Sequence, residues 1–480
     1  MKGNLKKILP VIFSILLFSL AFIFIMLKGR EVGNTNLQLA PENYLYHEKF
    51  GYSKPYSTND ISGIGFVKNV RINNVAGSSE PKIAVHPLNK NIYAVSANDF
   101  SIDESHARIF ISTDGAVNWE PKQIPLSGVI KKSSYSDPWI GFDSEGNLYF
   151  IAVQFDLENN MREGIFISRS SDNGNTWEAD LTFIDYNNKE KIKIDRPRMC
   201  IDKTSANKNN IYVVWTEIKG LNSFVMFSKS TDKGDTFTKP VTLESADVDY
   251  CSVITNSAGD LFVTYLKDEN KISLIKSENA GESWNPVEYL ASTEHAGVRS
   301  GGKYILKNRD GKGIRANTEP VTAVTKNDDL IITYSAAGSN ADVSDIYFMK
   351  ISKDMKEITA PIKINNDNSK SDQFLPSITV DESNNIFILY QDSRNDPDNM
   401  LTETYVSYSG DNGKTFHDEK ISTKNFDPSQ ISVNNYFCDY NSCIAADDKL
   451  VGVWTDGRNE NFDLYAGMFG INDLLKNIQR

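Results

Sequence analysis

Short runs of alternating hydrophobic and polar residues, separated by turn-forming residues, fill most of the chain from about residue 63 onward. Residues 164–169, Gly-Ile-Phe-Ile-Ser-Arg, are a typical run, and residues 211–215 and 386–390 are others. A run of this kind predicts a β-strand with one buried face. The pattern therefore predicts an all-β domain.

The runs recur as a repeated unit. Each unit has a first strand that ends in Asp, an aromatic-rich second strand, a third strand that ends in a turn, and a short fourth strand. Such a repeat predicts a β-propeller blade. Seven units follow one another, and their first strands begin at Glu80, Asp137, Arg196, Tyr250, Glu319, Leu375 and Asn441. We expect seven four-stranded blades, or six if the fourth or fifth unit is an insertion.

The seventh unit ends without a fourth strand. Residues 65–72, which precede the first unit, have the right length and pattern to supply it. This pairing would close the propeller with an N-terminal strand and leave no exposed sheet edge. We expect the propeller to cover residues 61–470, with a C-terminal tail at 471–480.

A turn with the spacing Ser-x-Asp-x-Gly-x-x-aromatic recurs after the third strands. A carboxylate accepts backbone N–H groups in such a turn, and glycine adopts φ > 0 without strain. Because these turns follow third strands, they lie at the opposite end of each blade from the first-strand starts, and we interpret them as structural. They stand at 170–177, 230–237 and 409–416, with variants at 112–119 and 277–284 and a half copy at 352–354.

A hydrophobic segment from Ile8 to Leu27 stands near the N-terminus, after three lysines. About 20 such residues span roughly 30 Å as a helix, which is the thickness of a bilayer core. We predict an uncleaved membrane signal anchor at 1–28 and a linker at 29–60; a cleaved signal peptide is the alternative. The propeller would then lie on the extracytoplasmic side of a single-pass cell-membrane protein.

Charge and composition exclude several classes of partner. The chain has 51 basic and 63 acidic residues, a net charge of −12, and no long basic tract, which argues against nucleic acid. Five histidines and four cysteines give no metal-site spacing, so we expect no metal and no cofactor. Cys438 and Cys443 either close a small loop or are buried thiols.

The first-strand starts and the loops after the second strands lie on one face, where a functional site is expected. Arginines are concentrated there, and a guanidinium suits bidentate binding of a carboxylate. Two of them stand in repeated Asp-x-Arg segments, for which a local ion pair is the alternative interpretation. The candidate binding residues are Arg196, Arg198, Arg394 and Arg458.

The turns, with Ser170, Asp172, Gly174 and Trp177 as the best copy, resemble the Asp-boxes of the sialidase-like (BNR/Asp-box repeat) propellers. The resemblance implies a propeller that acts on glycans. Sialidases use a tyrosine nucleophile paired with a glutamate, an aspartate acid/base and an arginine triad. One departure is clear: the first unit reads Ser79-Glu80-Pro81, where the family has Arg-Ile-Pro.

On this resemblance the site can be assigned residue by residue. Arg196, Arg394 and Arg458 would form the triad, with Arg198 beside them. The catalytic residues would be Tyr250 as nucleophile, Glu319 or Glu217 as its partner, and Asp137 or Asp99 as the acid.

We expect the chain to have one of two functions. The first is a cell-surface sialidase-like glycoside hydrolase, an exo-α-sialidase that removes terminal acidic sugars. The second is a non-catalytic propeller that binds a glycan or a protein. Under either, we expect a monomer with a glycan or glycoprotein ligand, bound to the membrane through its N-terminal helix.

Overall fold

The computed structural model describes part of the chain, and the described residues belong to one compact unit, Tyr56–Ser101 with Ser105–Arg480. They are residues 68–73, 77–99, 106–124, 133–156, 162–178, 182–186, 192–204, 206–300, 303–309, 312–338, 344–432 and 435–476.

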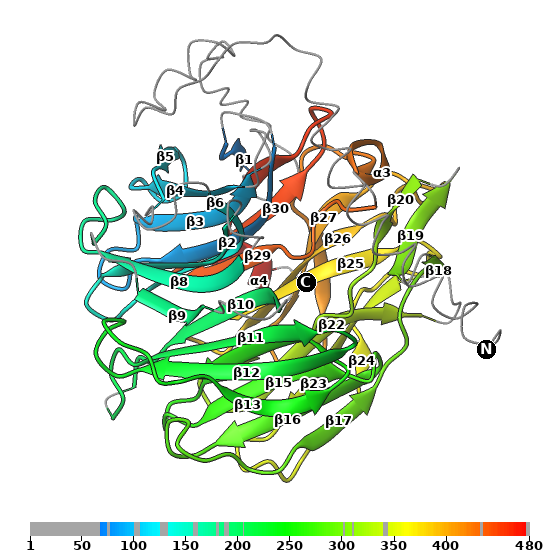
Figure 1. Cartoon of the computed structure of the whole chain (residues 1–480). Coiled ribbons are helices and arrows are strands. Elements are labelled where there is room, and N and C mark those ends of the chain that lie inside the picture. Colours follow the sequence, from blue (N-terminus) through cyan, green and yellow to red (C-terminus); the bar gives the residue numbers. More distant parts are fainter. Residues whose placement is uncertain are drawn as a thin grey trace, which may run out of the picture. The chain divides into compact units, whose positions relative to one another are not determined.

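Seven four-stranded antiparallel sheets make up most of this unit (Figure 1). We number them as blades 1 to 7 in the order of their first strands. Blades 1 to 3 contain β2 (Ser78–Val85), β3 (Tyr93–Asp99), β4 (His106–Ser112) and β5 (Glu120–Lys122); β6 (Ser133–Phe142), β7 (Leu148–Asp156), β8 (Arg162–Ser170) and β9 (Thr182–Tyr186); and β10 (Lys193–Ile201), β11 (Ile211–Lys219), β12 (Asn222–Ser230) and β13 (Val241–Ala246).

The later blades are built in the same way. Blades 4 to 6 contain β14 (Val248–Thr255), β15 (Leu261–Lys267), β16 (Lys271–Ser277) and β17 (Glu288–Ser292); β21 (Val321–Val324), β22 (Leu330–Ala337), β23 (Ser344–Ile351) and β24 (Ile362–Lys363); and β25 (Gln373–Val380), β26 (Ile386–Asp392), β27 (Glu403–Ser409) and β28 (His417–Lys420). Blade 7 contains β29 (Ser442–Ala446), β30 (Lys449–Asp456) and β31 (Asp463–Gly470), to which β1 (Lys68–Arg71) is added as the fourth strand.

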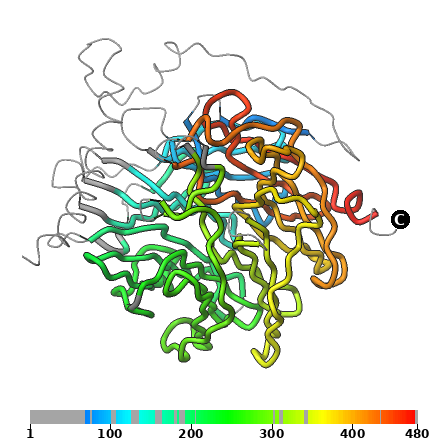
Figure 2. Tube along the Cα trace, turned by 90° about the vertical axis from the view of Figure 1, so that its right-hand side faces the viewer, coloured from blue at the N-terminus to red at the C-terminus, as the bar shows by residue number. Residues whose placement is uncertain are grey.

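The first strands of the blades contact one another in sequence, from β2 through β6, β10, β14, β21, β25 and β29, and β29 contacts β2 again. The blades are thus arranged around a common centre lined by their first strands. Figure 2 shows the N-terminal strands beside the C-terminal ones, where β1 pairs with β31. Residues 65–72 were predicted to supply this strand.

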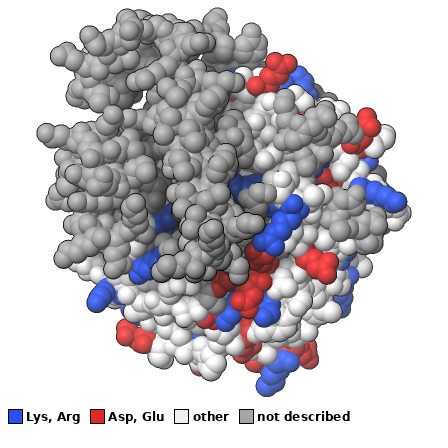
Figure 3. All heavy atoms as spheres, turned by 45° about the vertical axis from the view of Figure 1, so that its right-hand side comes forward, with Lys and Arg blue, Asp and Glu red and all other residues white. Residues whose placement is uncertain are grey.

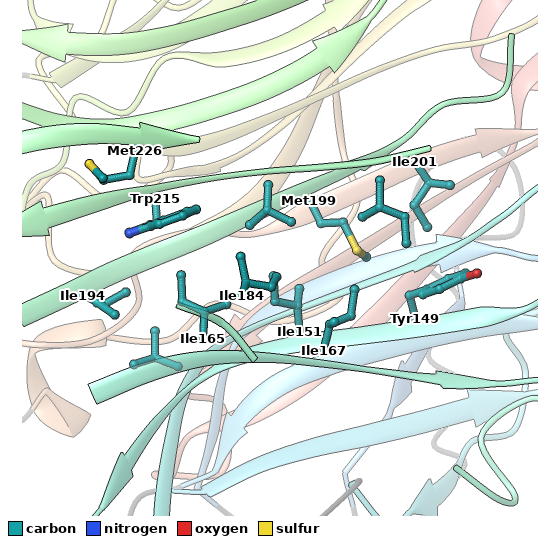
Figure 4. Close-up of a cluster of buried hydrophobic side chains, with 13 residues drawn as sticks. Tyr149, Ile151, Ile165, Ile167, Ile184, Ile194, Met199, Ile201, Trp215 and Met226 are labelled. Atoms are coloured by element: carbon teal, nitrogen blue, oxygen red, sulfur yellow. The ribbon is translucent and has the colours of Figure 1, made fainter. Parts of the chain in front are cut away.

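Hydrophobic side chains of adjacent blades share the space between them. Between blades 2 and 3, for example, 13 side chains form one cluster (Figure 4). Trp215 and Tyr149 are among them, and both are fully buried. Burying a large side chain stabilises the fold by about 1.5–3 kcal/mol, so the stacking of blades accounts for much of the stability.

An insertion separates blades 4 and 5. Its strands β18 (Val298–Ser300), β19 (Lys303–Arg309) and β20 (Lys312–Arg315) form a three-stranded sheet. Leu306 and Ile314 of this sheet pack against Phe374 and Leu375 of blade 6. The insertion is therefore fixed onto the propeller by its own small hydrophobic cluster.

The predicted fold class needs correction in two respects. In the part of the chain that the structure describes, no helix is long and apolar enough to cross a membrane. The helices there, α3 (Pro428–Ile431) and α4 (Ile471–Leu475), are single turns. The membrane-anchored fold and the single-pass cell-membrane localisation are therefore not supported; residues 1–28, on which both rested, lie outside the described residues. Moreover, no described sheet closes on itself, because each blade is an open sheet.

Acidic and basic side chains are interspersed on the face shown in Figure 3. The described part of that face presents no continuous basic area of the kind that binds a polyanion. The expected absence of nucleic acid as a partner stays a prediction.

Candidate functional site

A backbone irregularity recurs at the start of five of the seven first strands. In blades 1, 2, 3, 4 and 6 the pairing between first and second strands shifts at the start of the first strand. In four of them a proline, which has no N–H for the ladder, follows the irregular residue. These residues have φ between 49° and 57°, and they are Glu80, Asp137, Arg196, Tyr250 and Leu375.

Positive φ is strained for such residues and costs about 1–3 kcal/mol each. The repetition of the same strain in five blades shows that the fold maintains it. Four of the five side chains are charged or carry a hydroxyl, and those four interact at the centre of the unit.

Arg196 is the hub of these interactions. Its Nη1 donates to Glu319 at 3.1 Å, and its Nη2 donates to Asp439 at 2.5 Å. Its guanidinium lies over the ring of Tyr250, 4.4 Å from the centroid. Its backbone N–H donates to the carboxylate of Asp137 at 3.3 Å. One buried arginine therefore joins residues of blades 2, 3 and 4 to those that precede blades 5 and 7.

Arg315, at the end of β20, makes the second arginine contact with Asp439. Both its Nε and its Nη2 donate to that carboxylate, and Asn317 donates to it at 2.8 Å. Arg315 Nη2 also lies 4.0 Å from Glu80. The insertion thus contributes a charged residue to the centre of the propeller.

Arg198 is the third arginine of the cluster. Its Nη2 donates to Glu319 at 3.2 Å. Its guanidinium lies 4.4 Å from the ring centroids of both Trp139 and Tyr440. Its Nη1 and the hydroxyl of Tyr440 are buried and have no hydrogen-bond partner among the described residues.

A second chain of hydrogen bonds links the carboxyl groups of blades 1 and 2. Asn98 donates to Glu80 at 2.8 Å and accepts from the backbone N–H of Asp137 at 3.0 Å. The side chain of Glu80 is thereby held next to the arginine cluster. We call Glu80, Asp137, Arg196, Arg198, Arg315, Glu319, Asp439 and Tyr440 the central cluster.

The environment separates the pKa values of these carboxyl groups. Burial, with repulsion from Asp439 and Asp137, raises the pKa of Glu80 well above its usual range. Burial, with repulsion from Asp195, raises the pKa of Asp137 to about 6. Burial also opposes ionisation of Asp439, but Arg315 and Arg196 outweigh it and hold the pKa of that carboxyl far below its usual range. The cluster therefore holds proton-donating carboxyls beside a carboxylate that stays ionised.

The residues predicted as catalytic all lie in or beside this cluster. Asp137 and Glu319 are bound by Arg196 as described above. The hydroxyl of Tyr250 donates to Asn317 at 3.1 Å, and burial raises its pKa. The structure thus brings together Tyr250, Glu319, Asp137, Arg196 and Arg198, and their chemical roles stay predictions.

Arg394 and Arg458 do not join this group. Arg394 pairs with Asp392 at 2.6 Å and Asp418 at 2.8 Å, and Arg458 pairs with Asp456 at 2.7 Å. Each also lies over a tyrosine ring of its own blade. This is the local ion pair that the sequence offered as the alternative, and substrate binding by these two arginines stays a prediction.

The turns that carry the Asp-box spacing lie at the other end of the blades. In blade 3, Ile194 pairs with Glu217, whereas Ile211 pairs with Ser230, where the turn begins. The hydroxyl of Ser230 accepts the N–H of Gly234 at 2.8 Å, and Asp232 accepts the N–H of Thr236 at 2.9 Å. The turn is a hydrogen-bonded structural element, far along the strand from Arg196.

The thiols and the acidic groups give no metal site in the described part of the chain. All four cysteines are free, so Cys438 and Cys443 close no loop. Cys438 lies 2.9 Å from the carbonyl oxygen of Tyr440, and Cys443 contacts Ser377. No group of three or more His, Cys, Asp or Glu residues suited to a metal ion occurs among the described residues.

Residues 82–263 match a family model described as "BNR repeat-like domain". The match supports the sialidase-like BNR-repeat family. No curated protein sequence matches the chain.

Several solved structures are similar to this chain. A protein of unknown function from Dyadobacter fermentans has a TM-score of 0.47 at 14% identity, covering 73% of this chain and 97% of that one. A leech intramolecular trans-sialidase has a TM-score of 0.47 at 12% identity, and the match covers 72% of this chain and 68% of that one. An α-L-arabinofuranosidase of Fusarium graminearum has a TM-score of 0.44 at 13% identity, and the match covers 71% of this chain and 94% of that one. At these values the neighbours do not decide the activity.

Sequence reasoning missed several members of the central cluster. Arg315 lies in residues 291–316, the longest segment between two units. The Gly and charged residues of this segment are the one sequence feature that could have pointed to it. Asp439 and Tyr440 stand between Cys438 and Cys443. These two cysteines suggested a disulfide-closed loop, so no role was predicted for the residues between them. Glu80 was visible as a first-strand start, but it occupied the position where the resembling family has an arginine.

Proposed function

We propose that this BNR-repeat propeller is a glycoside hydrolase whose active site is the central cluster. The observation that supports it best is the pairing of Glu80 and Asp137, whose pKa values are raised, with Asp439, whose pKa is lowered, in one hydrogen-bonded group. Carboxyl groups whose environments push their pKa values apart are the usual means of acid and base catalysis by one site.

The proposed chemistry follows from these charges. Asp137 or Glu80 donates its proton to the glycosidic oxygen as the bond to the anomeric carbon breaks. The ionised Asp439 stabilises the positive charge that develops on the sugar ring. Water then adds its hydroxyl to the anomeric carbon, and its proton returns to the carboxylate that acted as the acid.

In this proposal Tyr250 positions the side chain of Arg196 and is not the nucleophile. Its ring lies under Arg196, and its hydroxyl donates to the amide oxygen of Asn317 rather than to a carboxylate among the described residues. A tyrosine nucleophile needs such a partner. The two-carboxyl scheme therefore fits the cluster better than the tyrosine–glutamate pair expected from the resemblance, and exo-α-sialidase specificity stays a prediction.

Turnover of a panel of fluorogenic glycosides, with neutral and acidic sugars, tests the proposal on the full chain. We expect hydrolysis of at least one glycoside and a loss of at least about 100-fold in kcat for Asp137→Asn, since general acid catalysis contributes about 10²–10⁴-fold. Asp235→Asn is the matched control, because Asp235 is exposed near the Asp-box turn of blade 3. Equal activity of the two variants would refute Asp137 as the acid.

A binding role without catalysis is the second candidate. It is favoured by the strong ion pairs of Arg196 and Arg315 with Asp439, which stabilise the centre of the fold without any ligand. Binding of a sugar without turnover of any glycoside in the panel would favour this candidate.

A further inference from the structure

The arginines of the central cluster already bind carboxylates of the protein. Both terminal nitrogens of Arg196 donate to carboxylates, to Glu319 and to Asp439. Two nitrogens of Arg315 donate to Asp439, as does the side chain of Asn317. The side-chain amide and guanidinium groups thus surround Asp439 as they would surround the carboxylate of a ligand.

The charge of the cluster leaves no surplus for an acidic ligand. With Glu80 protonated, the three guanidinium groups still stand beside three carboxylates above pH 6: Glu319 and Asp439, which they contact directly, and Asp137, which accepts from the backbone N–H of Arg196. A substrate carboxylate would add a fourth in a buried place. Like charges at short range repel strongly where water is excluded, so this addition is unfavourable.

Two polar atoms in the cluster nevertheless lack a partner. Arg198 Nη1 and the Tyr440 hydroxyl are buried and make no hydrogen bond within the described residues. Arg198 is 2% exposed and Tyr440 is 5% exposed, and the guanidinium lies over the tyrosine ring. Buried donors left unpaired cost about 1–3 kcal/mol each, so a ligand or water that satisfies them would be stabilised.

The chemistry of these two atoms indicates what they bind. Arg198 Nη1 only donates, whereas a tyrosine hydroxyl both donates and accepts. A sugar hydroxyl can accept from the arginine and exchange a hydrogen bond with the tyrosine. Because Glu319 already neutralises Arg198, the unpaired nitrogen offers a hydrogen bond without an uncompensated positive charge.

From this geometry we propose that the central cluster takes a neutral sugar residue, one hydroxyl of which binds between Arg198 Nη1 and the Tyr440 hydroxyl. Asp439 and Glu319 occupy the arginines that a carboxylate-bearing sugar would need. The inference rests on the proposed function and names the substrate class of that site.

The test compares neutral and acidic sugars on the same full-length protein. Fluorogenic glycosides of neutral hexoses and pentoses and of N-acetylneuraminic acid are assayed side by side. Binding of the corresponding free sugars is measured by isothermal titration calorimetry at pH 7.5. We expect a neutral glycoside to be hydrolysed at least about 100-fold faster, in kcat/KM, than the sialoside.

Tyr440→Phe removes the hydroxyl and keeps the ring beneath Arg198. We expect it to raise KM, or the Kd of the free sugar, about tenfold for the neutral sugar, as for the loss of one buried hydrogen bond. Tyr347→Phe is the matched control, because the Tyr347 hydroxyl donates to the carbonyl oxygen of Ala337 at 3.4 Å, outside the cluster. The control should leave both constants unchanged.

The outcomes separate this inference from the proposed function. If no glycoside is hydrolysed, catalysis fails, but neutral-sugar binding that depends on Tyr440 still supports the substrate class. Faster turnover or tighter binding of the acidic sugar overturns it, as does the absence of any sugar binding. If Tyr440→Phe does not fold, the wild-type comparison of neutral and acidic sugars decides alone.

Discussion

Asp137 combines a strained backbone, a half-buried carboxyl and a direct contact with the backbone N–H of Arg196 in a single residue. The same combination recurs at Glu80, next to Arg315. A residue with φ > 0 before a proline is energetically unfavourable, and burial of its carboxyl adds to that cost. At the residue scale, therefore, these strained positive φ angles occur at residues whose charged side chains lie in the central cluster.

The pH dependence of stability tests the burial of Asp137. Its folded pKa of about 6 lies above the unfolded value of about 3.9, so the folded state binds more protons between these pH values. Its contribution to stability is therefore present below pH 4 and is lost as pH rises through 6. Relative to wild type, we expect Asp137→Asn to gain about 2 kcal/mol in unfolding free energy between pH 4 and pH 7.

Urea unfolding of wild type and variant at several pH values measures this gain. Glu382→Gln is the control, because Glu382 is largely exposed and pairs with Lys326 on the surface. A constant difference between wild type and Asp137→Asn across the pH range would show that the Asp137 carboxyl is not buried as described.

At the scale of the element, the Asp-box turns join neighbouring blades. The ring of Trp284 packs on Phe227 of the preceding blade, with centroids 4.8 Å apart, and Phe416 packs on Phe348 in the same way. Trp177 donates to the carbonyl oxygen of Gln123, which follows blade 1. These three aromatic side chains therefore contact the preceding blade or the segment that follows it.

Gly281 tests this coupling. It has φ +80°, and a Cβ there would lie 2.6 Å from Phe227, so Gly281→Ala combines backbone strain with a clash. We expect it to lower the unfolding free energy by about 2–4 kcal/mol, the sum of the two effects. Gly220→Ala isolates the strain, because Gly220 has φ +65° and no atom within 4 Å of an added Cβ.

Chemical denaturation of both variants gives the comparison. The difference between them measures the close approach of the turn to the preceding blade. Equal destabilisation would mean that Phe227 moves aside without cost and that the turn does not couple the blades.

At the scale of the whole molecule, the two ends of the described chain meet in blade 7. Asn69 of β1 donates to the carbonyl oxygen of Ile421 at 2.8 Å and accepts from Thr423 at 2.7 Å. These bonds connect the N-terminal strand to the segment that follows blade 6. Contacts of this kind join residues far apart in the sequence and hold the ring of blades together.

Asn69→Ala removes the side-chain bonds and leaves the β1–β31 pairing. We expect a loss of about 1–3 kcal/mol in unfolding free energy, because Asn69 is buried and its partners lose their hydrogen bonds. Limited proteolysis should also cleave near β1 faster. Asn461→Ala is the control, since Asn461 is exposed and donates to the carbonyl oxygen of its near neighbour Asn459. Equal proteolysis of both variants would contradict a role for Asn69 in closing the ring.

The repeated pattern of strands was sufficient to predict the all-β class, the boundaries of most blades and the structural part of the Asp-box turns. These properties are local, because alternation, turn residues and prolines act within a few positions of one another. The sequence also located Arg196, Arg198, Glu319, Asp137 and Tyr250 near one face, since topology fixes where first strands begin.

Only the tertiary structure decided which of these charges interact. Arg315 reaches the cluster because β20 packs on blade 6, and Asp439 reaches it because blade 7 closes beside blade 1. Arg394 and Arg458 occupy similar sequence contexts, yet each is held by the aspartate two residues before it. The Asp-box turns identify the repeat through local chemistry, whereas the site depends on contacts between residues more than 100 positions apart, which no local pattern encodes.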